Sequence, residues 1–252
     1  MNNIFIVTHV PVNFTPPKGY SFLKAGSVII ENQFSDDSGD NISHLNPYYS
    51  ELTGLYWIWK NYKCDPEDIV GLVHYRRVFG DSGIYSILKK TFLPIDKIIE
   101  DLSHSDIIVP DRRYFKNGIY NFYKKYHEIT DLEACLDYLS SNGKLSSEVE
   151  KMIKSDKRGV VCNMFITKKK TLDKYCEWLF PMFFSVHKNL DLDVRSEYQK
   201  RAMAFLGEHL FNVWLWSNPD LILTERPIIK LYKSAISNLN GYRKHIIYRA
   251  NK

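Results

Sequence analysis

Short apolar runs constrain the fold of this 252-residue sequence more than any other feature. They cover residues 4–8, 68–75, 106–109 and 160–167, and polar residues or a proline stop them. Continuous apolar runs of this length are typical of strands that are buried on both faces of a sheet. Because helical patterns separate these runs, the sequence predicts an α/β fold with a mostly parallel sheet flanked by helices.

Helical signals fill most of the remaining sequence. Asn46 is a good N-cap and Pro47 suits a first helical position, so we expect a helix over residues 46–62. Residues 10–27 predict a loop, followed by a short strand at 28–30. Residues 111–127 are expected to be irregular or partly helical. Further helices are expected at 95–103, 131–140, 146–155, 171–188 and 197–216, which makes the C-terminal half rich in helix.

Composition excludes several classes of protein. The 44% apolar and 25% charged residues suit one soluble globular domain, and a net charge of +5 is small for a nucleic-acid-binding protein. The four cysteines lack metal-ligand spacing, no apolar window is long enough to span a membrane, and no secretory signal begins the chain. We therefore expect a cytoplasmic protein with reduced thiols.

Arg76 and Arg77 follow the apolar run at 68–75. Ligands of open α/β sheets bind at the carboxyl ends of strands, and two adjacent guanidinium groups are costly to bury without anions. Arginine binds phosphate oxygens in fork geometry, so we expect a phosphate or diphosphate here. His74 would contact that phosphate, ligate a metal or hold the strand end. The plainer alternative is a pair of arginines in surface salt bridges.

Polar residues around the start of the helix at 46–62 form a second candidate group. Asn46, Tyr49 and Glu51 lie where free N–H groups and the helix dipole favour an anion. In the preceding polar loop, Asp40 and Asn41 can hydrogen-bond a ribose, a uracil or a sugar hydroxyl. The alternatives are a carboxylate that only complements the helix dipole and a solvent-exposed turn.

Glu208 is the candidate general base. It interrupts an apolar helical stretch, where desolvation in a cleft would raise the pKa of its carboxyl. The alternative is a glutamate paired with a neighbouring arginine such as Arg201. The sequence carries no Walker loop, no GxGxxG after a strand, no HExxH and no GxSxG, which excludes several common enzyme classes as first choices.

Several segments taken together resemble a bacterial family that is catalogued as a domain of unknown function. They are DSGDNIS at 37–43, ELTGLYWIWKN at 51–61, GLVHYRR at 71–77, NMFI at 163–166, YCEWLF at 175–180 and FLGEHLFNVW at 205–214. Members of this family occur in capsule and O-antigen clusters and are assigned as glycosyltransferases related to the GT-A fold, some of them galactofuranosyltransferases. The resemblance extends from Ile4 to about Pro227.

The resemblance implies a donor site for a UDP-sugar at the carboxyl edge of a GT-A-like, Rossmann-like sheet, and an acceptor site beside it. Arg76 and Arg77 would neutralise the leaving diphosphate, and Glu208 would deprotonate the acceptor hydroxyl in an inverting reaction. The implied donor-binding residues are Thr8, His9, Asp40, Asn41, Asn46, Tyr49, Glu51, His74, Arg76 and Arg77. The implied acceptor-binding residues are Asn163, Met164, His127 and Glu208.

A divalent metal is not expected. GT-A relatives carry Asp-x-Asp where this sequence has His-Tyr-Arg-Arg, which puts Mn²⁺ or Mg²⁺ in doubt, so we predict no metal ligands and no required cofactor. An Asp-x-Asp does occur at Asp191 and Asp193, but it follows a predicted helix rather than a buried strand.

We expect one glycosyltransferase domain over residues 1–252. Residues 1–110 would form the nucleotide-sugar half, 111–227 the acceptor half and 228–252 a basic tail. The acceptor implied by the resemblance is a lipid-linked oligosaccharide, so the tail could contact the inner face of the cytoplasmic membrane. Two other hypotheses are a non-catalytic nucleotide- or carbohydrate-binding protein of GT-A shape, and a nucleic-acid-binding protein that uses residues 111–127. The small net charge speaks against the second, and we expect no nucleic-acid partner.

Overall fold

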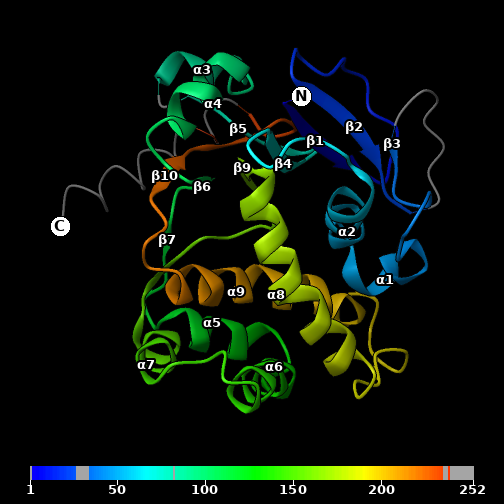
Figure 1. The fold of residues 1–252 in the computed structure, drawn as a ribbon, viewed down its shortest axis with the longest axis vertical. Coiled ribbons are helices and arrows are strands. Elements are labelled where there is room, and N and C mark those ends of the chain that lie inside the picture. Colours follow the sequence, from blue (N-terminus) through cyan, green and yellow to red (C-terminus); the bar gives the residue numbers. More distant parts are fainter. Residues whose placement is uncertain (1, 27–33, 82, 235–237, 239–252) are drawn as a thin grey trace.

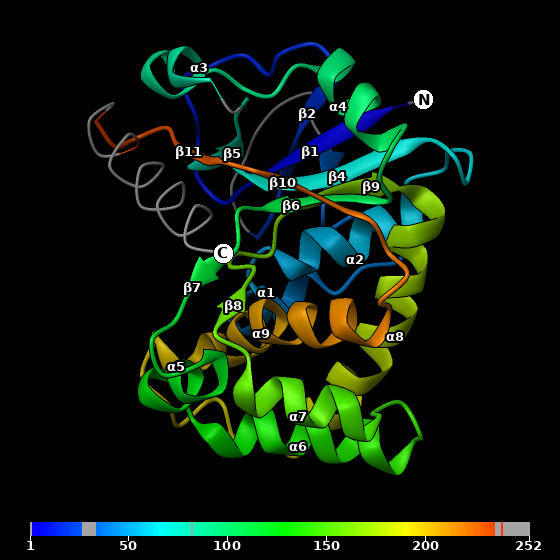
Figure 2. The same cartoon turned by 90° about the vertical axis from the view of Figure 1, so that its left-hand side faces the viewer.

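The computed structural model describes residues 2–26, 34–81, 83–234 and 238. Within these residues nine strands form one mixed sheet and two more form a separate pair. Figures 1 and 2 show the sheet with helices on both of its faces and a further helical layer on one side. The strands are β1 (Asn3–Thr8), β2 (Tyr20–Lys24), β3 (Phe34–Ser35), β4 (Ile69–His74), β5 (Arg77–Phe79), β6 (Ile107–Pro110), β7 (Arg113–Tyr114), β8 (Arg158–Gly159), β9 (Phe165–Lys168), β10 (Leu223–Arg226) and β11 (Ile228–Lys230).

Most helical residues follow residue 110, which confirms the predicted helix-rich C-terminal half. The 3₁₀ turns are η1 (Ser43–Leu45) and η2 (Gln199–Arg201). The α-helices are α1 (Asn46–Tyr49), α2 (Leu52–Asn61), α3 (Ile84–Lys89), α4 (Ile95–Leu102), α5 (Ile119–Tyr126), α6 (Ile129–Ser141), α7 (Ser147–Ser155), α8 (Lys169–His187) and α9 (Ala202–Ser217).

The sheet is built around a parallel block. Strands β3, β2, β1 and β4 are adjacent and parallel, so Ile4 of β1 lies opposite both Tyr20 and Gly71. Strand β9 pairs antiparallel with β4 and β6, and β10 lies parallel to β6 at the edge. The predicted α/β architecture is confirmed, with one antiparallel strand inserted between the parallel segments.

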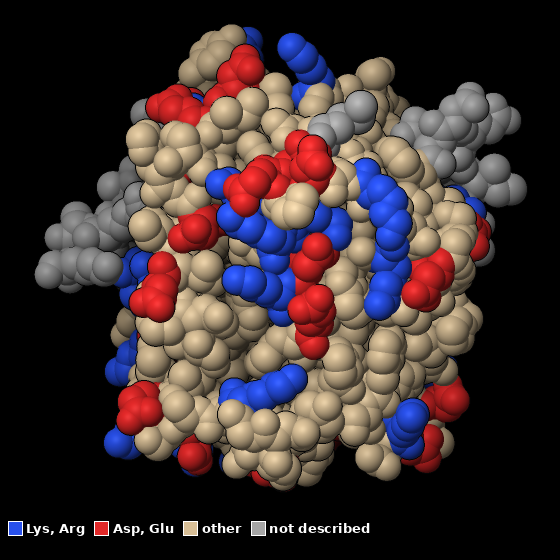
Figure 3. Space-filling view, in the orientation of Figure 1, with Lys and Arg blue, Asp and Glu red and all other residues tan. Residues whose placement is uncertain are grey.

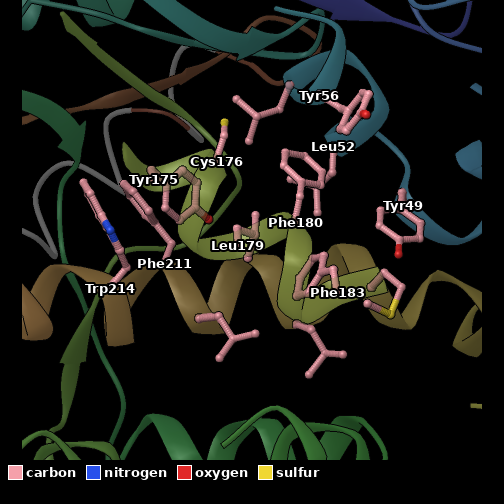
Figure 4. Packing of buried hydrophobic residues seen from close by; sticks show 14 of the residues in the cluster. Tyr49, Leu52, Tyr56, Tyr175, Cys176, Leu179, Phe180, Phe183, Phe211 and Trp214 are labelled. Atoms are coloured by element: carbon pink, nitrogen blue, oxygen red, sulfur yellow. The ribbon is translucent and has the colours of Figure 1, made fainter. Parts of the chain in front are cut away.

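The central strands are buried on both faces, which explains their continuous apolar sequences. In β1, Ile4 and Ile6 face a core that α4 covers, whereas Phe5 and Val7 face the core beneath α2, α8 and α9. Figure 4 shows aromatic and aliphatic side chains filling the larger core where α8 lies across α9.

A second helical layer supports α8 and α9 from below (Figure 1). Helix α6 packs against α8 and α9, and α7 packs against α5 and α9. Arg195 donates two hydrogen bonds to the buried carboxylate of Asp131 on α6, one of them 2.9 Å long. This buried pair fixes the segment before η2 to the helical layer, because separating the two charges would leave one buried alone.

Charges of both signs are interspersed on the face shown in Figure 3. Near the start of α8, Lys168 and Lys170 both pair with Glu67, and Lys169 pairs with Asp173. A face of this kind lacks the one-sided positive field that typically binds nucleic acid.

The helix expected at residues 46–62 is two helices. Ser50 has a φ of 49°, a conformation that costs a non-glycine residue about 1–3 kcal/mol, and α1 ends before it. Asn46 is therefore not the cap of one continuous helix. Its side-chain nitrogen donates to the Ser50 carbonyl and to Thr53 Oγ1, each at 3.0 Å. The break places Glu51 between the two helices.

Several strand predictions also differ from the structure. Strand β2 lies within the predicted loop at 10–27, and β11 lies in the predicted tail, where Lys230 pairs with β5. The strand expected at 160–167 begins only at Phe165, because the Asn212 side chain bonds the Val160 backbone in place of a neighbouring strand. The strand expected at 28–30 and most of the basic tail lie outside the described residues.

Candidate functional site

A cleft of about 1310 Å³ opens where the parallel strands β1 and β4 end. The ends of these strands and Asn46 at the start of α1 form one wall, and residues of α5 and α9 form the opposite wall. Figure 2 shows that these helices lie on the same side of the sheet. Ligands of open α/β sheets bind at this position, because the strand ends leave a crevice beside the loops that follow them.

Three carboxylates, Glu51, Asp111 and Glu208, line the cleft. Burial and the negative charge of Glu51 raise the pKa of Glu208 to about 7. A hydrogen bond from the Cys162 backbone N–H and the charges of Arg77 and Arg201 oppose this shift. A carboxyl group with a pKa near 7 can accept a proton at neutral pH and release it again, as a general base must.

Cys162 contributes a strained backbone to the site. Its φ of 71° lies in the left-handed region that non-glycine residues rarely adopt, and its N–H is directed at Glu208. Arg77 Nη1 lies 3.5 Å from the Cys162 Sγ atom. Burial raises the pKa of the Cys162 thiol to about 12, so the sulfur is uncharged at neutral pH and is not a nucleophile.

Asn163 holds Glu51 in place, and His74 lies beside it. Asn163 Nδ2 donates to Glu51 Oε1 at 2.6 Å and to the Ala204 carbonyl at 3.0 Å. His74 Nε2 lies 3.9 Å from the same carboxylate oxygen and 3.3 Å from the Asn163 carbonyl. Burial lowers the pKa of His74, so the imidazole is neutral and its Nε2–H donates to that carbonyl. The arrangement fixes Glu51 against the wall of the cleft.

Cations line the cleft beside the carboxylates. Arg76 is exposed and stacks on the Tyr75 ring at 5.2 Å, and within the described residues neither Arg76 nor Arg77 forms an ion pair. Arg112 differs, because Glu225 accepts from its Nε at 2.8 Å. Unpaired guanidinium groups at strand ends fit an anionic ligand such as a diphosphate. The other lining cations are Arg113, Arg201 and Lys230.

The structure brings most of the predicted site residues together. Asn163 does not line the cleft, but it positions Glu51 from behind. The predicted residues that line the cleft are His9, Asn46, Glu51, His74, Arg76, Arg77, His127 and Glu208.

Thr8, Asp40 and Asn41 lie elsewhere, contrary to expectation. Thr8 is fully buried, and its hydroxyl donates to the Val10 carbonyl. Asp40 accepts from the Tyr56 hydroxyl at 3.0 Å, so its loop is folded back onto α2. Asn41 is used within the same loop, where it accepts from Ser43.

Tyr49 and Met164 were also expected in the site, but both are core residues with no exposed surface. The Tyr49 ring packs edge-on against Phe183, with ring centroids 5.9 Å apart. Figure 4 shows both rings in the core beside α8. Met164 lies on the opposite face of the sheet, in the core that α4 covers. In both cases apolar neighbours hold the side chain in the core. The sequence pattern alone does not distinguish such a core position from a position in the site.

The sequence did not predict a group of aromatic rings in the cleft. Tyr126, Tyr198 and Phe205 join the predicted His127 on the helical wall. The richness of residues 111–127 in tyrosine was a signal for part of this group, but nothing local connects it to Phe205. The strained φ of Cys162 has no sequence signature at all.

Metal and membrane signals are absent from the described part of the chain. In residues 2–26, 34–81, 83–234 and 238, no three His, Cys, Asp or Glu side chains are grouped as a metal site. No helix within the same ranges is both long and apolar enough to cross a membrane. Asp193 of the sequence Asp-x-Asp does not line the cleft; it accepts a hydrogen bond from Tyr48.

The fold and the cleft define an α/β protein with a ligand site at the carboxyl ends of parallel strands. Residues 3–219 match the family described as Domain of unknown function (DUF4422), and the chain belongs to this family. No protein with a curated description matches the sequence.

A solved structure gives the comparison in three dimensions. The chain is similar to the apo structure of the WbbM bifunctional glycosyltransferase, with a TM-score of 0.82 and 24% sequence identity. The similarity covers 92% of this chain and 45% of WbbM, so the chain spans less than half of the length of that protein. At this identity the likeness establishes the shared fold.

Proposed function

We propose that this chain is a glycosyltransferase that uses a UDP-sugar donor. One observation carries the proposal: a carboxyl group with a pKa of about 7, Glu208, shares a cleft with two arginines that form no ion pair within the described residues. Glycosyl transfer to a hydroxyl needs a proton acceptor and a positive site for the departing diphosphate. The fold shared with WbbM, a bifunctional glycosyltransferase, supports this assignment.

The donor lies along the strand ends. Its diphosphate binds between Arg76 and Arg77, which take the place of a divalent metal, and its nucleoside extends towards His9 and Asn46. Preorganised cations at the point where negative charge develops are generally a large catalytic contribution.

Glu208 takes the proton of the acceptor hydroxyl. The acceptor oxygen forms a bond to the anomeric carbon of the donor sugar, and the bond from that carbon to the UDP oxygen breaks. UDP leaves with the electron pair, and the configuration at the anomeric carbon inverts. Glu51, held by Asn163, keeps the pKa of Glu208 high through its negative charge.

The finer identity follows from the sequence motifs and is part of the same proposal. The donor sugar is galactofuranose or another hexose, and the acceptor is a lipid-linked oligosaccharide in capsule or O-antigen synthesis. The enzyme works at the inner face of the cytoplasmic membrane, where such acceptors are presented.

The test measures UDP binding by titration calorimetry. Arg76→Ala and Arg77→Ala should each weaken UDP about tenfold or more, because each removes a charge-assisted contact to phosphate. Lys154→Ala is the matched control, since Lys154 is an exposed cation on α7 outside the cleft. Unchanged UDP affinity in both arginine variants would remove the proposed diphosphate site.

A second measurement separates an enzyme from a binding protein. Wild-type protein is incubated with a panel of UDP-sugars, with and without saccharide acceptors, and released UDP is measured. Sugar-dependent release supports the transferase. Tight UDP binding with every UDP-sugar left intact would instead identify a non-catalytic protein of the same fold.

A further inference from the structure

Four aromatic rings line the helical wall of the cleft and are called here the ring platform: Tyr126, His127, Tyr198 and Phe205. His127, Tyr198 and Phe205 contact one another, and Tyr126 contacts Phe122. The His127 ring stacks on Phe205 with centroids 4.2 Å apart and planes 29° apart. Tyr198 lies 4.9 Å from Phe205 and 6.0 Å from His127. The rings come from the end of α5, the segment before η2, and α9, so the surface exists only in the folded protein.

Two side chains of the ring platform are far more exposed than core residues are. Tyr198 is 56% exposed and Tyr126 is 48% exposed, although both are large aromatic side chains beside a deep cleft. Single exposed rings are common on protein surfaces, but several rings that line one concave site mark a binding surface. The platform therefore has an apolar face that is available to a ligand.

The histidine of the ring platform is neutral, and the edge of the platform is polar. Burial lowers the pKa of His127, so its imidazole is neutral. The Arg201 guanidinium lies 5.5 Å from the centre of the Phe205 ring, and its Nε donates to Ser50 Oγ at 2.9 Å. A flat apolar surface with hydrogen-bond donors at its rim matches a sugar ring, which presents a C–H face and a periphery of hydroxyl groups.

The ring platform lies on the same side of α9 as the proposed base, Glu208. Phe205 and Glu208 are three residues apart on α9 and therefore lie on the same side of the helix, and both line the cleft. We infer that the ring platform is the acceptor subsite, on which the terminal saccharide of the acceptor stacks with its hydroxyl directed to Glu208. This inference rests on the proposed glycosyltransferase function.

The other ligand with a stacking face is the base of the nucleotide donor. The strand ends at Val7, Ala25 and His9 lie on the opposite wall from the platform, and they are where nucleotides bind in open α/β sheets. The diphosphate site at Arg76 and Arg77 directly follows β4 on that same wall. The geometry therefore assigns the base to the strand ends and the saccharide to the rings.

The test compares Tyr198→Ala and Tyr126→Ala with wild type. Saccharide binding is measured by saturation-transfer difference NMR with methyl β-D-galactopyranoside, methyl β-D-galactofuranoside and methyl β-D-glucopyranoside, in the presence of UDP. UDP affinity is measured separately by calorimetry. We expect saccharide affinity to fall about tenfold in each alanine variant, with UDP affinity unchanged. Tyr198→Phe should retain saccharide binding, because the ring remains.

Tyr85→Ala is the matched control, because Tyr85 is 71% exposed on α3 and does not line the cleft. Saccharide binding that survives both alanine variants, or no saccharide binding by wild type, would overturn the inference and leave the UDP site untouched. Loss of UDP affinity in Tyr198→Ala would also overturn it, since the rings would then hold the donor base. Failure of wild type to bind UDP would refute the proposed function, and the saccharide titration would still decide whether the rings bind sugar.

Discussion

Glu208→Gln should change the pH dependence of stability as well as activity. Burial beside Glu51 raises the pKa of Glu208 from its ordinary value of 4.5 to about 7. Each pKa unit corresponds to about 1.36 kcal/mol, so the ionised carboxylate costs the folded protein at most about 3 kcal/mol. Glutamine has nearly the same shape and no charge to desolvate, so the variant escapes this cost.

The sign of this pH dependence follows from which state, folded or unfolded, keeps the proton of Glu208. Between about pH 4.5 and 7 the folded protein keeps the proton of Glu208, whereas the unfolded chain has lost it. Folding therefore binds a proton, and the contribution of this group to stability is full below pH 4.5 and falls as the pH rises through 7. Relative to wild type, the variant should be equally stable near pH 4.5 and up to about 3 kcal/mol more stable at pH 8.

Urea unfolding of both proteins at pH 5, 6, 7 and 8 measures this difference directly. Taking the difference between the two proteins cancels the titration of other groups, such as His74. Glu177→Gln is the matched control, because it makes the same chemical change at an exposed position on α8 and should give a flat difference. A flat difference for Glu208→Gln as well would refute the argument that burial holds this carboxyl protonated.

Turnover gives the second readout of the same variant. A general base typically contributes about 10²- to 10⁴-fold to the rate, so transfer should fall by that factor while UDP affinity is kept. In wild type the rate should rise with pH and level off above about 7, because only the ionised form of Glu208 accepts a proton. Wild-type turnover in the variant would exclude Glu208 as the base.

Two further changes test the metal prediction and the packing behind the site. Treatment with EDTA should leave most of the transfer activity, and complete loss that Mn²⁺ or Mg²⁺ restores would show that the arginines do not replace a metal. Gly207→Ala should destabilise the fold by about 1–3 kcal/mol, because a Cβ there would lie 2.8 Å from Leu52 and 3.0 Å from Asn163. Gly83→Ala, whose Cβ would meet no atom within 4 Å, is the control in thermal unfolding, and equal melting temperatures for the two variants would contradict the packing argument.

The elements that the sequence predicted well are those whose own residues determine them. The apolar runs that form β1, β4 and β6 are buried on both faces of the sheet. Their apolar composition alone was therefore sufficient to predict them as strands. Strand β10 has the sequence Leu-Thr-Glu-Arg, and it forms because β6 offers backbone partners at the sheet edge, which no local pattern reveals. The break at Ser50 was hidden for the same reason, since tertiary contacts stabilise a conformation that serine disfavours.

The same distinction applies to the residues of the candidate site. Arg76, Arg77 and Glu208 stood out because charge next to apolar sequence is unusual wherever it occurs. Tyr49 was misplaced because a tyrosine at a helix start looks the same whether it faces a ligand or Phe183. The ring platform was missed because Tyr126 and Phe205 are far apart in the chain, and only the packing of α5 near α9 brings them to one wall.

Strands β10 and β11 determine where the chain can be truncated. The family match ends at residue 219, but β10 and β11 follow it, and Ile229 of β11 has no exposed surface. A recombinant protein that ends at the family boundary would lack β10, so β6 would become the edge strand of the sheet. The backbone N–H and C=O groups with which β6 pairs to β10 would then have no partner, although all four residues of β6 are buried in the intact protein. Such an edge recruits strands from other molecules, so the trimmed protein should self-associate rather than fold as a smaller domain. The boundary of recognisable sequence is therefore not the boundary of the folding unit.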